Sequence, residues 1–188
     1  MLTLTHEQLD KALPYATDSA LIKYLPLFNK HFEKYKVNTL KRAAAFLAQI
    51  AEESGSLRYV EEIASGSAYE YRKDLGNLNP IALQIAHQNY TTTGKFYKGR
   101  GLIQITGYYN YVKVAEALGI PCDKSPKLLT DPEYAVQSAL WYWDTHNCNI
   151  LADVDNFTGI TRAINGGLTN YNQRMQNWAT AKAALGIV

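Results

Sequence analysis

The stretch that most constrains the fold is Thr39–Glu53, a predicted helix that is apolar on almost every face and ends in two acids. Its central part, Ala43–Ala51, contains one polar residue, a glutamine. Such a helix is surrounded by protein, because a helix at a surface carries a polar face. The pair Glu52-Glu53 then lies at the negative end of the helix dipole, where Lys or Arg would be favoured. Local rules are broken in this way at functional sites more often than in scaffold. The alternative is a pair of solvated acids on a fraying last turn.

The two acids are not equivalent. At helical spacing Glu53 shares a strip with Phe46, Gln49 and Ile50, whereas Glu52 lies on a different strip of the helix. A carboxyl group packed against apolar side chains at a helix C-terminus has its charged form disfavoured, so its pKa is raised. A general acid that works near neutral pH needs a raised pKa. We therefore predict that Glu53 is a general acid.

Composition sets broad limits on the class of protein. A chain of 188 residues fits one domain with a full core, or two closely packed lobes. Nineteen basic and seventeen acidic residues give a net charge of +2, which is too small to indicate a nucleic-acid partner. The 14 tyrosines and three tryptophans suit a sugar-binding cleft as well as a core, because their rings are flat, partly apolar and able to hydrogen-bond.

The first residues contain no basic n-region, apolar h-region or signal cleavage site. No window approaches the run of about 18 apolar residues that crosses a bilayer. We therefore expect a protein made soluble in the cytoplasm, without stable membrane insertion. Two cysteines, Cys122 and Cys148, are too few for a disulfide framework and fit a reducing compartment, although a single pairing stays open.

Hydrophobic periodicity predicts a mainly α-helical chain with no internal repeat and no linker. The middle of the chain, residues 55–97, is predicted to be irregular, and long loops inside compact domains are usually functional. Residues 99–107 alternate briefly and are predicted to form a small strand or an extended turn. In the second helix Pro26 is expected to cause a kink or a break. The predicted helices span residues 5–13, 18–35, 39–53, 81–88, 109–118, 133–146, 157–164 and 170–185.

Carboxylates in the irregular middle are candidate partners for Glu53, since glycoside hydrolysis needs one protonated and one ionised carboxyl group on either side of the scissile bond. Glu70 lies between two tyrosines and Arg72, whose charge is expected to keep it ionised. For each of these acids the alternative is a solvated side chain. The candidates are Glu61, Glu62, Glu70 and Asp74.

The segment that begins Gly99-x-Gly101 lacks the remaining spacing of a phosphate-binding loop. We instead predict that its glycines let backbone approach a ligand closely. Gln104 and Thr106, two residues apart, are expected to point to the same side, where they can hold a water or a sugar amide. Further along, Asn165-Gly166-Gly167 is either a helix C-cap or an exposed Asn in a cleft wall.

Neither a metal nor a cofactor is expected. The four histidines are scattered, with no i, i+4 pair and no acid converging on them. Cys148 close to His146 suggests a thiol hydrolase, but neighbours in sequence are rarely the pair that reacts in the fold.

Several motifs in register, from about residue 46 to residue 178, resemble the family 19 glycoside hydrolases, the chitinase family that includes many single-domain bacteriophage endolysins. The first motif looks like the family's helix that carries the general acid. One departure is Glu52, which stands where the family usually has His. The motifs are Phe46-x-x-Gln49-x-x-x-Glu53-Ser54-Gly55, the stretch Phe96–Thr106, Asn110-Tyr111, Leu129-x-x-Pro132, Ala139-x-Trp141-Tyr142-Trp143 and Ile164-Asn165-Gly166-Gly167.

The resemblance implies a lysozyme-like α-helical (α+β) fold with a substrate cleft between two lobes and at most a very small β element. It implies a single catalytic domain over residues 1–188, with a core at about 39–185. Glu53 would be the general acid and Glu70 the base, with Glu62 as the alternative base. Family members invert the anomeric centre, so the carboxyl groups stand about 6.5–9.5 Å apart, with room for water between them. Thr106 and Gln104 would hold that water and the substrate. The positions that match cleft-lining residues are Tyr97, Asn110, Asn165 and Arg174.

These implications together predict a monomeric endolysin that cuts the β-1,4 glycan strands of bacterial peptidoglycan. It would stay in the host cytoplasm until a separate pore protein releases it to the periplasm and cell wall. A chitinase acting on chitin is the alternative with the same chemistry. A non-catalytic glycan-binding module and, more remotely, a helical DNA-binding protein are alternatives from other classes.

Overall fold

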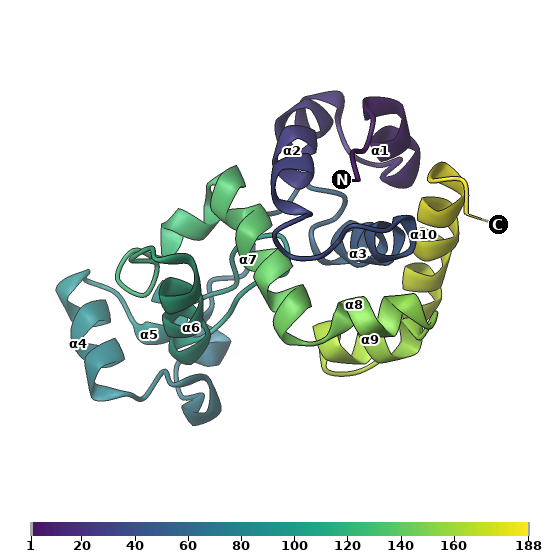
Figure 1. The fold of residues 1–188 in the computed structure, drawn as a ribbon. Coiled ribbons are helices and arrows are strands. Elements are labelled where there is room, and N and C mark those ends of the chain that lie inside the picture. The colour runs from purple at the N-terminus through teal and green to yellow at the C-terminus, as the bar shows by residue number, and fades with distance from the viewer. Residues whose placement is uncertain (1, 188) are drawn as a thin grey trace. The chain divides into compact units, whose positions relative to one another are not determined.

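The computed structural model describes residues 2–187 and is mainly α-helical (Figure 1). Among the described residues β structure is limited to isolated bridges that join Arg100 to Glu61 and to Ile105. The expected mainly α fold with at most a very small β element is therefore confirmed. The helices, with 3₁₀ helices written η, are α1 His6–Ala12, α2 Asp18–His31, α3 Leu40–Glu53, η1 Ser67–Tyr69, η2 Lys73–Leu75, α4 Pro80–Gln88, α5 Thr93–Phe96, α6 Tyr108–Leu118, η3 Pro126–Thr130, α7 Pro132–Thr145, α8 Cys148–Asp153, α9 Phe157–Asn165 and α10 Tyr171–Ala184.

The chain forms two compact units. The first consists of the chain up to Tyr59 and from Ala139 onward, and the second is Val60–Ser138. None of the helices in the described part is long and apolar enough to cross a membrane. Both cysteines, Cys122 and Cys148, are free, so the pairing that the sequence left open is not formed.

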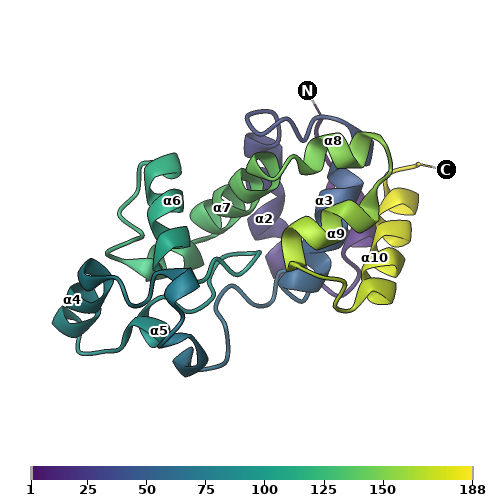
Figure 2. The same cartoon turned by 90° about the horizontal axis from the view of Figure 1, so that it is seen from below.

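The first unit is built around α3, which α1, α8, α9 and α10 contact (Figures 1 and 2). Thr39 caps the helix, because its side chain accepts a hydrogen bond from the backbone of Arg42. Every residue from Ala43 to Ile50 is buried, as the apolar pattern predicts. Phe46 packs edge-on against the ring of Trp143, with centroids 5.4 Å apart. The helix that ends in the two acids is thus the core of its unit.

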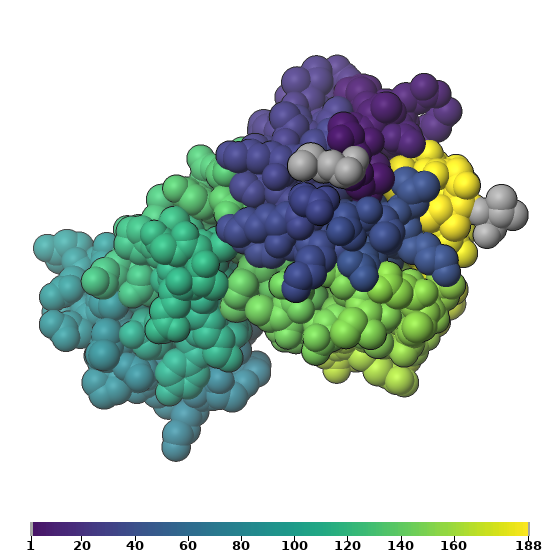
Figure 3. All heavy atoms as spheres, in the orientation of Figure 1, coloured from purple at the N-terminus to yellow at the C-terminus, as the bar shows by residue number. Residues whose placement is uncertain are grey.

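The two ends of the chain close this unit, since α10 packs on both α1 and α3. Figure 3 shows the atoms of the C-terminal helix, in yellow, beside those of the N-terminal segments, in purple. In the same unit α2 runs unbroken through Pro26. It ends at His31, whereas the sequence predicted a helix to residue 35. The chain turns there because Lys36 takes a left-handed conformation, with φ 57°, and Val37 then hydrogen-bonds back to Phe32.

The second unit contains the long irregular segment that the sequence predicted. Its helices are short, and three tyrosine rings, Tyr97, Tyr108 and Tyr111, pack together in its interior. Asn77 is fully buried and ties two distant segments together. Its amide donates to the Tyr69 carbonyl at 2.8 Å, and its oxygen accepts the backbone N–H of Tyr108 at 3.1 Å. Polar side chains of this kind replace the regular hydrogen bonds that the loops lack.

Candidate active site

Glu53 is the last residue of α3, and its side chain is only 15% exposed. Nη2 of Arg174, itself 3% exposed, lies 2.6 Å from Glu53 Oε1. Among the described residues no N–H is aligned to hydrogen-bond this buried oxygen, so the contact is an ion pair. Burial raises the pKa of Glu53, Arg174 opposes that rise, and the neighbouring Glu52 adds to it. The net direction is upward, as its apolar strip predicts.

Arg174 is held in place by α3 and by the loop before α10. Its Nη1 donates to Gln49 Oε1 at 2.6 Å, and its Nε donates to the Thr169 carbonyl at 3.0 Å. Gln49 in turn donates to Thr161 Oγ1 at 3.0 Å. Arg174 was expected to line a cleft and touch substrate. The structure instead buries it against Glu53, where its charge faces the carboxyl group.

The second acid of the pair has a different environment. Glu52 Oε1 accepts a hydrogen bond from Asn170 Nδ2 at 2.7 Å.

Asn165 ends α9 before Gly166, whose φ of 74° makes it the C-cap. The cap reading of this motif is therefore confirmed. Asn165 is only partly buried, and its Oδ1 accepts the Thr169 N–H at 3.3 Å, while its NH₂ group has no partner among the described residues. That group is available to a ligand.

In the second unit Glu62 lies directly against the glycine-containing stretch. Its Oε2 accepts the backbone N–H of Gly99 at 3.1 Å, and its own backbone N–H donates to the Gly99 carbonyl at 2.9 Å. Its Oε1 accepts the Tyr69 hydroxyl at 3.1 Å. Both oxygens of the Glu62 side chain therefore accept a hydrogen bond. The sequence did not identify Tyr69 as a hydrogen-bond partner of Glu62.

Gln104 and Thr106 converge on the same glycine. A Cβ placed on Gly99 would stand 2.7 Å from Gln104 Oε1 and 3.2 Å from Thr106 Oγ1. The prediction that these two side chains share one side is therefore confirmed. Asn110, in the first turn of α6, donates to the Thr106 carbonyl at 2.8 Å. The structure thus brings Glu62, Gln104, Thr106 and Asn110 together.

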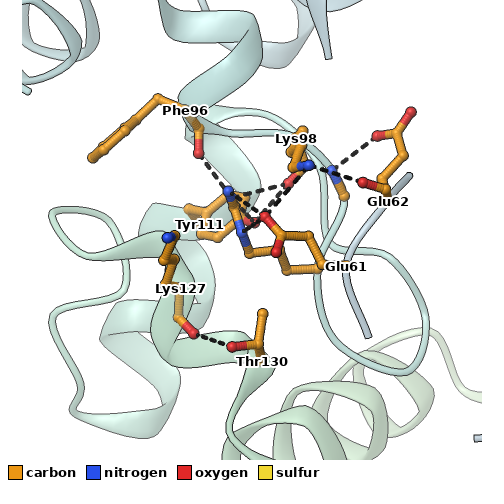
Figure 4. Close-up of polar contacts among 9 residues, drawn as sticks. Glu61, Glu62, Phe96, Lys98, Tyr111, Lys127 and Thr130 are labelled. Carbon is orange, nitrogen blue, oxygen red and sulfur yellow. Dashed lines mark hydrogen bonds and ion pairs between the residues drawn. The ribbon is translucent and has the colours of Figure 1, made fainter. Parts of the chain in front are cut away.

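A half-buried ion pair, between Arg100 and Glu61, lies next to this stretch (Figure 4). Arg100 is 4% exposed, and its Nη2 lies 3.0 Å from Glu61 Oε1. Its Nη1 donates to the Phe96 carbonyl at 2.8 Å and to the Tyr111 hydroxyl at 3.1 Å. Burial alone would raise the pKa of Glu61, but the charges of Arg100 and Lys98 outweigh it and lower the pKa. Glu61 is therefore a structural residue, paired with Arg100 and Lys98.

Glu70 lies elsewhere in the second unit. Its carboxylate accepts hydrogen bonds from the Thr92 hydroxyl and from the Gly94 N–H, the latter at 3.2 Å, at the start of α5. The expectation that Arg72 pairs with Glu70 is wrong, because the Arg72 guanidinium binds Asp74 at 2.6 Å. The Nε and Nη2 groups of Arg72 donate to the two oxygens of Asp74 at 2.8 and 2.6 Å, so the guanidinium is aligned with that carboxylate and not with Glu70.

Tyr97 was expected to line a cleft, but it is 0% exposed. Its hydroxyl donates to the Asp123 carbonyl at 2.8 Å, and its ring packs on Tyr108 and Tyr111. It is a core residue of the second unit and offers no surface to a ligand. Sequence alone does not separate the two roles, because a tyrosine suits either.

Each unit contains a candidate carboxyl group. The first unit supplies a buried carboxyl group, Glu53, that holds its proton to higher pH than an ordinary carboxyl group does. The second supplies a hydrogen-bonded carboxylate, Glu62, with a hydroxyl and an amide beside it. The described residues contain no group of His, Cys, Asp and Glu side chains suited to a metal ion. An acid and a base are what these residues can provide.

Comparison with known proteins gives consistent matches. The family model for chitinase class I matches residues 4–161. An endochitinase of Arabidopsis thaliana is 39% identical over 142 residues, which cover 74% of this chain and 44% of that protein. The chain therefore spans less than half the length of this curated relative. Chitinase C from Streptomyces griseus superposes with a TM-score of 0.69 at 25% identity, over 98% of this chain and 77% of that one. A bacterial family 19 chitinase superposes with a TM-score of 0.71 at 24% identity, over 100% and 97% of the two chains, which shows a shared fold.

Proposed function

Because the chain belongs to the chitinase class I family, glycoside hydrolase family 19, we propose that it hydrolyses β-1,4 glycosidic bonds and that its substrate is bacterial peptidoglycan. The observation that carries the proposal is Glu53, a buried carboxyl group with a raised pKa at the end of the core helix. A raised pKa lets such a group keep its proton to higher pH than an ordinary carboxyl group, so it can give that proton to the leaving-group oxygen.

The second role falls to Glu62. Of the two candidate bases it is the one that lies with Gln104 and Thr106, whereas Glu70 is bound to the start of α5. In the proposed reaction the Glu62 carboxylate removes a proton from a water that Thr106 and Gln104 hold. That water attacks the anomeric carbon on the face opposite the leaving group, so the configuration inverts. The Glu53 carboxylate left after proton transfer faces the positive charge of Arg174.

Chitin is the second candidate substrate, favoured by the names of the relatives, which are an endochitinase and bacterial chitinases. Peptidoglycan is supported by the family resemblance, because this family includes many single-domain bacteriophage endolysins. Both polymers consist of N-acetylated amino sugars joined β-1,4, so one carboxylate pair can cleave either.

The test incubates purified peptidoglycan and soluble chitin oligomers separately with wild type, Glu53→Gln, Glu62→Gln and Glu70→Gln. Mass spectrometry then identifies the fragments, and circular dichroism checks that each variant is folded. We expect fragments ending in reducing N-acetylmuramic acid from wild type and from Glu70→Gln, and a loss of at least about 100-fold in the other two variants. Normal activity in folded Glu53→Gln would end the mechanism. Cleavage of chitin alone would transfer the proposal to chitin, and binding without new reducing ends would indicate a glycan-binding module.

A further inference from the structure

A cavity of about 500 Å³ lies in the second unit, next to the Arg100–Glu61 ion pair. One wall comes from the end of α5, which carries Lys95. Another part comes from the turn before η3, with Lys124 and Ser125, and from η3 itself, with Lys127. Arg100 and Asn89 also line it, and no acidic side chain does. The volume is in the range of cavities that bind small molecules.

The charges in this cavity are not balanced. The ammonium groups of Lys95, Lys124 and Lys127 are exposed and make no ion pair or hydrogen bond with any described residue. Some lysines outside the cavity do pair with carboxylates, as Lys41 does with Asp155 at 2.6 Å. Arg100 is already matched by Glu61 at 3.0 Å. The three lysines therefore leave an excess of positive charge in a hollow.

The hydrogen-bonding groups of the cavity, like its positive charge, indicate an anionic ligand. An ammonium group has three donors and no acceptor, and the hydroxyl of Ser125 and the amide of Asn89 add further donors. A ligand that satisfies them is rich in acceptors and negatively charged. Chitin carries no charge, whereas the peptide stems of peptidoglycan carry carboxylates, including one at the end of the stem. We propose that this cavity binds the carboxylates of a peptidoglycan peptide stem; the inference rests on the proposed function.

The cavity is connected with the Glu62 cluster through one side chain. Arg100 lines the cavity and also pairs with Glu61, the residue next to Glu62. Figure 4 draws Lys127 on one side of the Glu61 network and Glu62 on the other. A glycan strand at Glu62 and a peptide stem in the cavity are thus bound by the same unit, on two sides of a rigid ion pair.

Direct binding is the first test, because it does not depend on catalysis. Wild type is titrated by calorimetry with a soluble stem tetrapeptide and with the same peptide carrying amidated carboxyl groups. The pocket variant is Lys95→Gln/Lys124→Gln/Lys127→Gln. Its control removes the same charge from exposed, unpaired lysines outside the cavity: Lys23→Gln/Lys73→Gln/Lys113→Gln. We expect the pocket variant and the amidated peptide each to raise Kd about tenfold or more, and the control less than about threefold.

The second test compares two substrates with one glycan backbone: intact peptidoglycan, and glycan strands whose peptides an amidase has removed. The pocket variant should lose about tenfold in kcat/KM on intact peptidoglycan and stay close to wild type on the bare strands. Equal activity of pocket variant and wild type on intact peptidoglycan, an equal loss in the control variant, or equal binding of the amidated peptide would overturn the inference. If wild type binds the free peptide through these lysines but cleaves no peptidoglycan, the proposed function fails while the binding site stands.

Discussion

At the scale of single residues, the protonation of Glu53 results from two opposing effects. Burial raises its pKa, and the charge of Arg174 lowers it. Replacing Arg174 by Gln removes the lowering effect, so the pKa of Glu53 should rise further. A general acid must be protonated, hence the alkaline limb of the kcat/KM profile should move to higher pH, while the rate at the optimum falls by up to about 100-fold because the carboxyl group is less well positioned.

The pH profile of kcat/KM for Arg174→Gln measures this directly. Arg162→Gln, an exposed arginine on α9, is the control and should leave the alkaline limb in place. A limb that moves to lower pH in Arg174→Gln would show that Arg174 does not act on Glu53 as a charge.

Gln49 supports the Glu53 carboxyl group indirectly, through Arg174. It is 1% exposed and links Thr161 to Arg174. Gln49→Leu keeps much of the volume but leaves a buried guanidinium N–H unpaired, so we expect a loss of about 1–3 kcal/mol in the free energy of unfolding. Urea denaturation measures the loss, with Gln176→Leu, an exposed glutamine on α10, as the control. Equal stability of the two variants would mean that Arg174 finds another partner.

At the scale of elements, α3 unites the core and the site, because the side chains that bury it also fix the orientation of its last residue. Phe46 is the largest side chain of this helix and meets the rings of Phe28, Phe32 and Trp143. Phe46→Ala should cost about 3–5 kcal/mol of unfolding free energy. Leu40→Ala, at a position on the same helix that is 39% exposed, should cost less than about 1 kcal/mol, and thermal unfolding compares the two. Similar costs would show that the helix is held by something other than this aromatic cluster.

Substitution of Gly99 should lower activity more than stability, whereas substitution of Gly119 should do the opposite. A methyl group there would come 2.7 Å from Gln104 Oε1, so Gly99→Ala should displace Gln104 and lower kcat at least about tenfold with little change in unfolding free energy. Gly119 has a left-handed φ of 67° with open space around it, so Gly119→Ala should cost about 1–2 kcal/mol of stability and leave kcat unchanged. Activity assays and urea denaturation on both variants test the contrast. A reversed pattern would contradict the placement of Gln104.

Long helices were predictable within a few residues, and α3, α7 and α10, with 14 residues each, are examples. The six-residue α8 and four-residue α5 were missed because so few residues show no period. Glu53 could be identified because its acidity conflicts with the apolar helix before it. The partnership of Glu53 with Arg174 could not, because 121 positions separate them and only the tertiary fold brings α10 against α3.

At the scale of the whole molecule, the chain has two compact units with very different interiors. Of the largest fully buried side chains, only Tyr97 and Tyr111 lie in the second unit, and all the others lie in the first. Hydrophobic burial is the main favourable term in folding, so the second unit should open at a lower denaturant concentration than the first.

Each unit contains one cysteine that can report this opening. Cys122 lies in the second unit and Cys148 in the first, both at 0% exposure. Burial raises the pKa of each thiol to about 12, so at pH 8 neither should react with a thiol reagent while the protein is folded. As urea increases, Cys122 should be labelled before Cys148, and mass spectrometry of digested protein measures each separately. Cys122→Ser and Cys148→Ser controls confirm the assignment. Simultaneous labelling of both thiols at every urea concentration would show that the two units unfold as one cooperative structure, because each buried thiol becomes reactive only when its own unit opens.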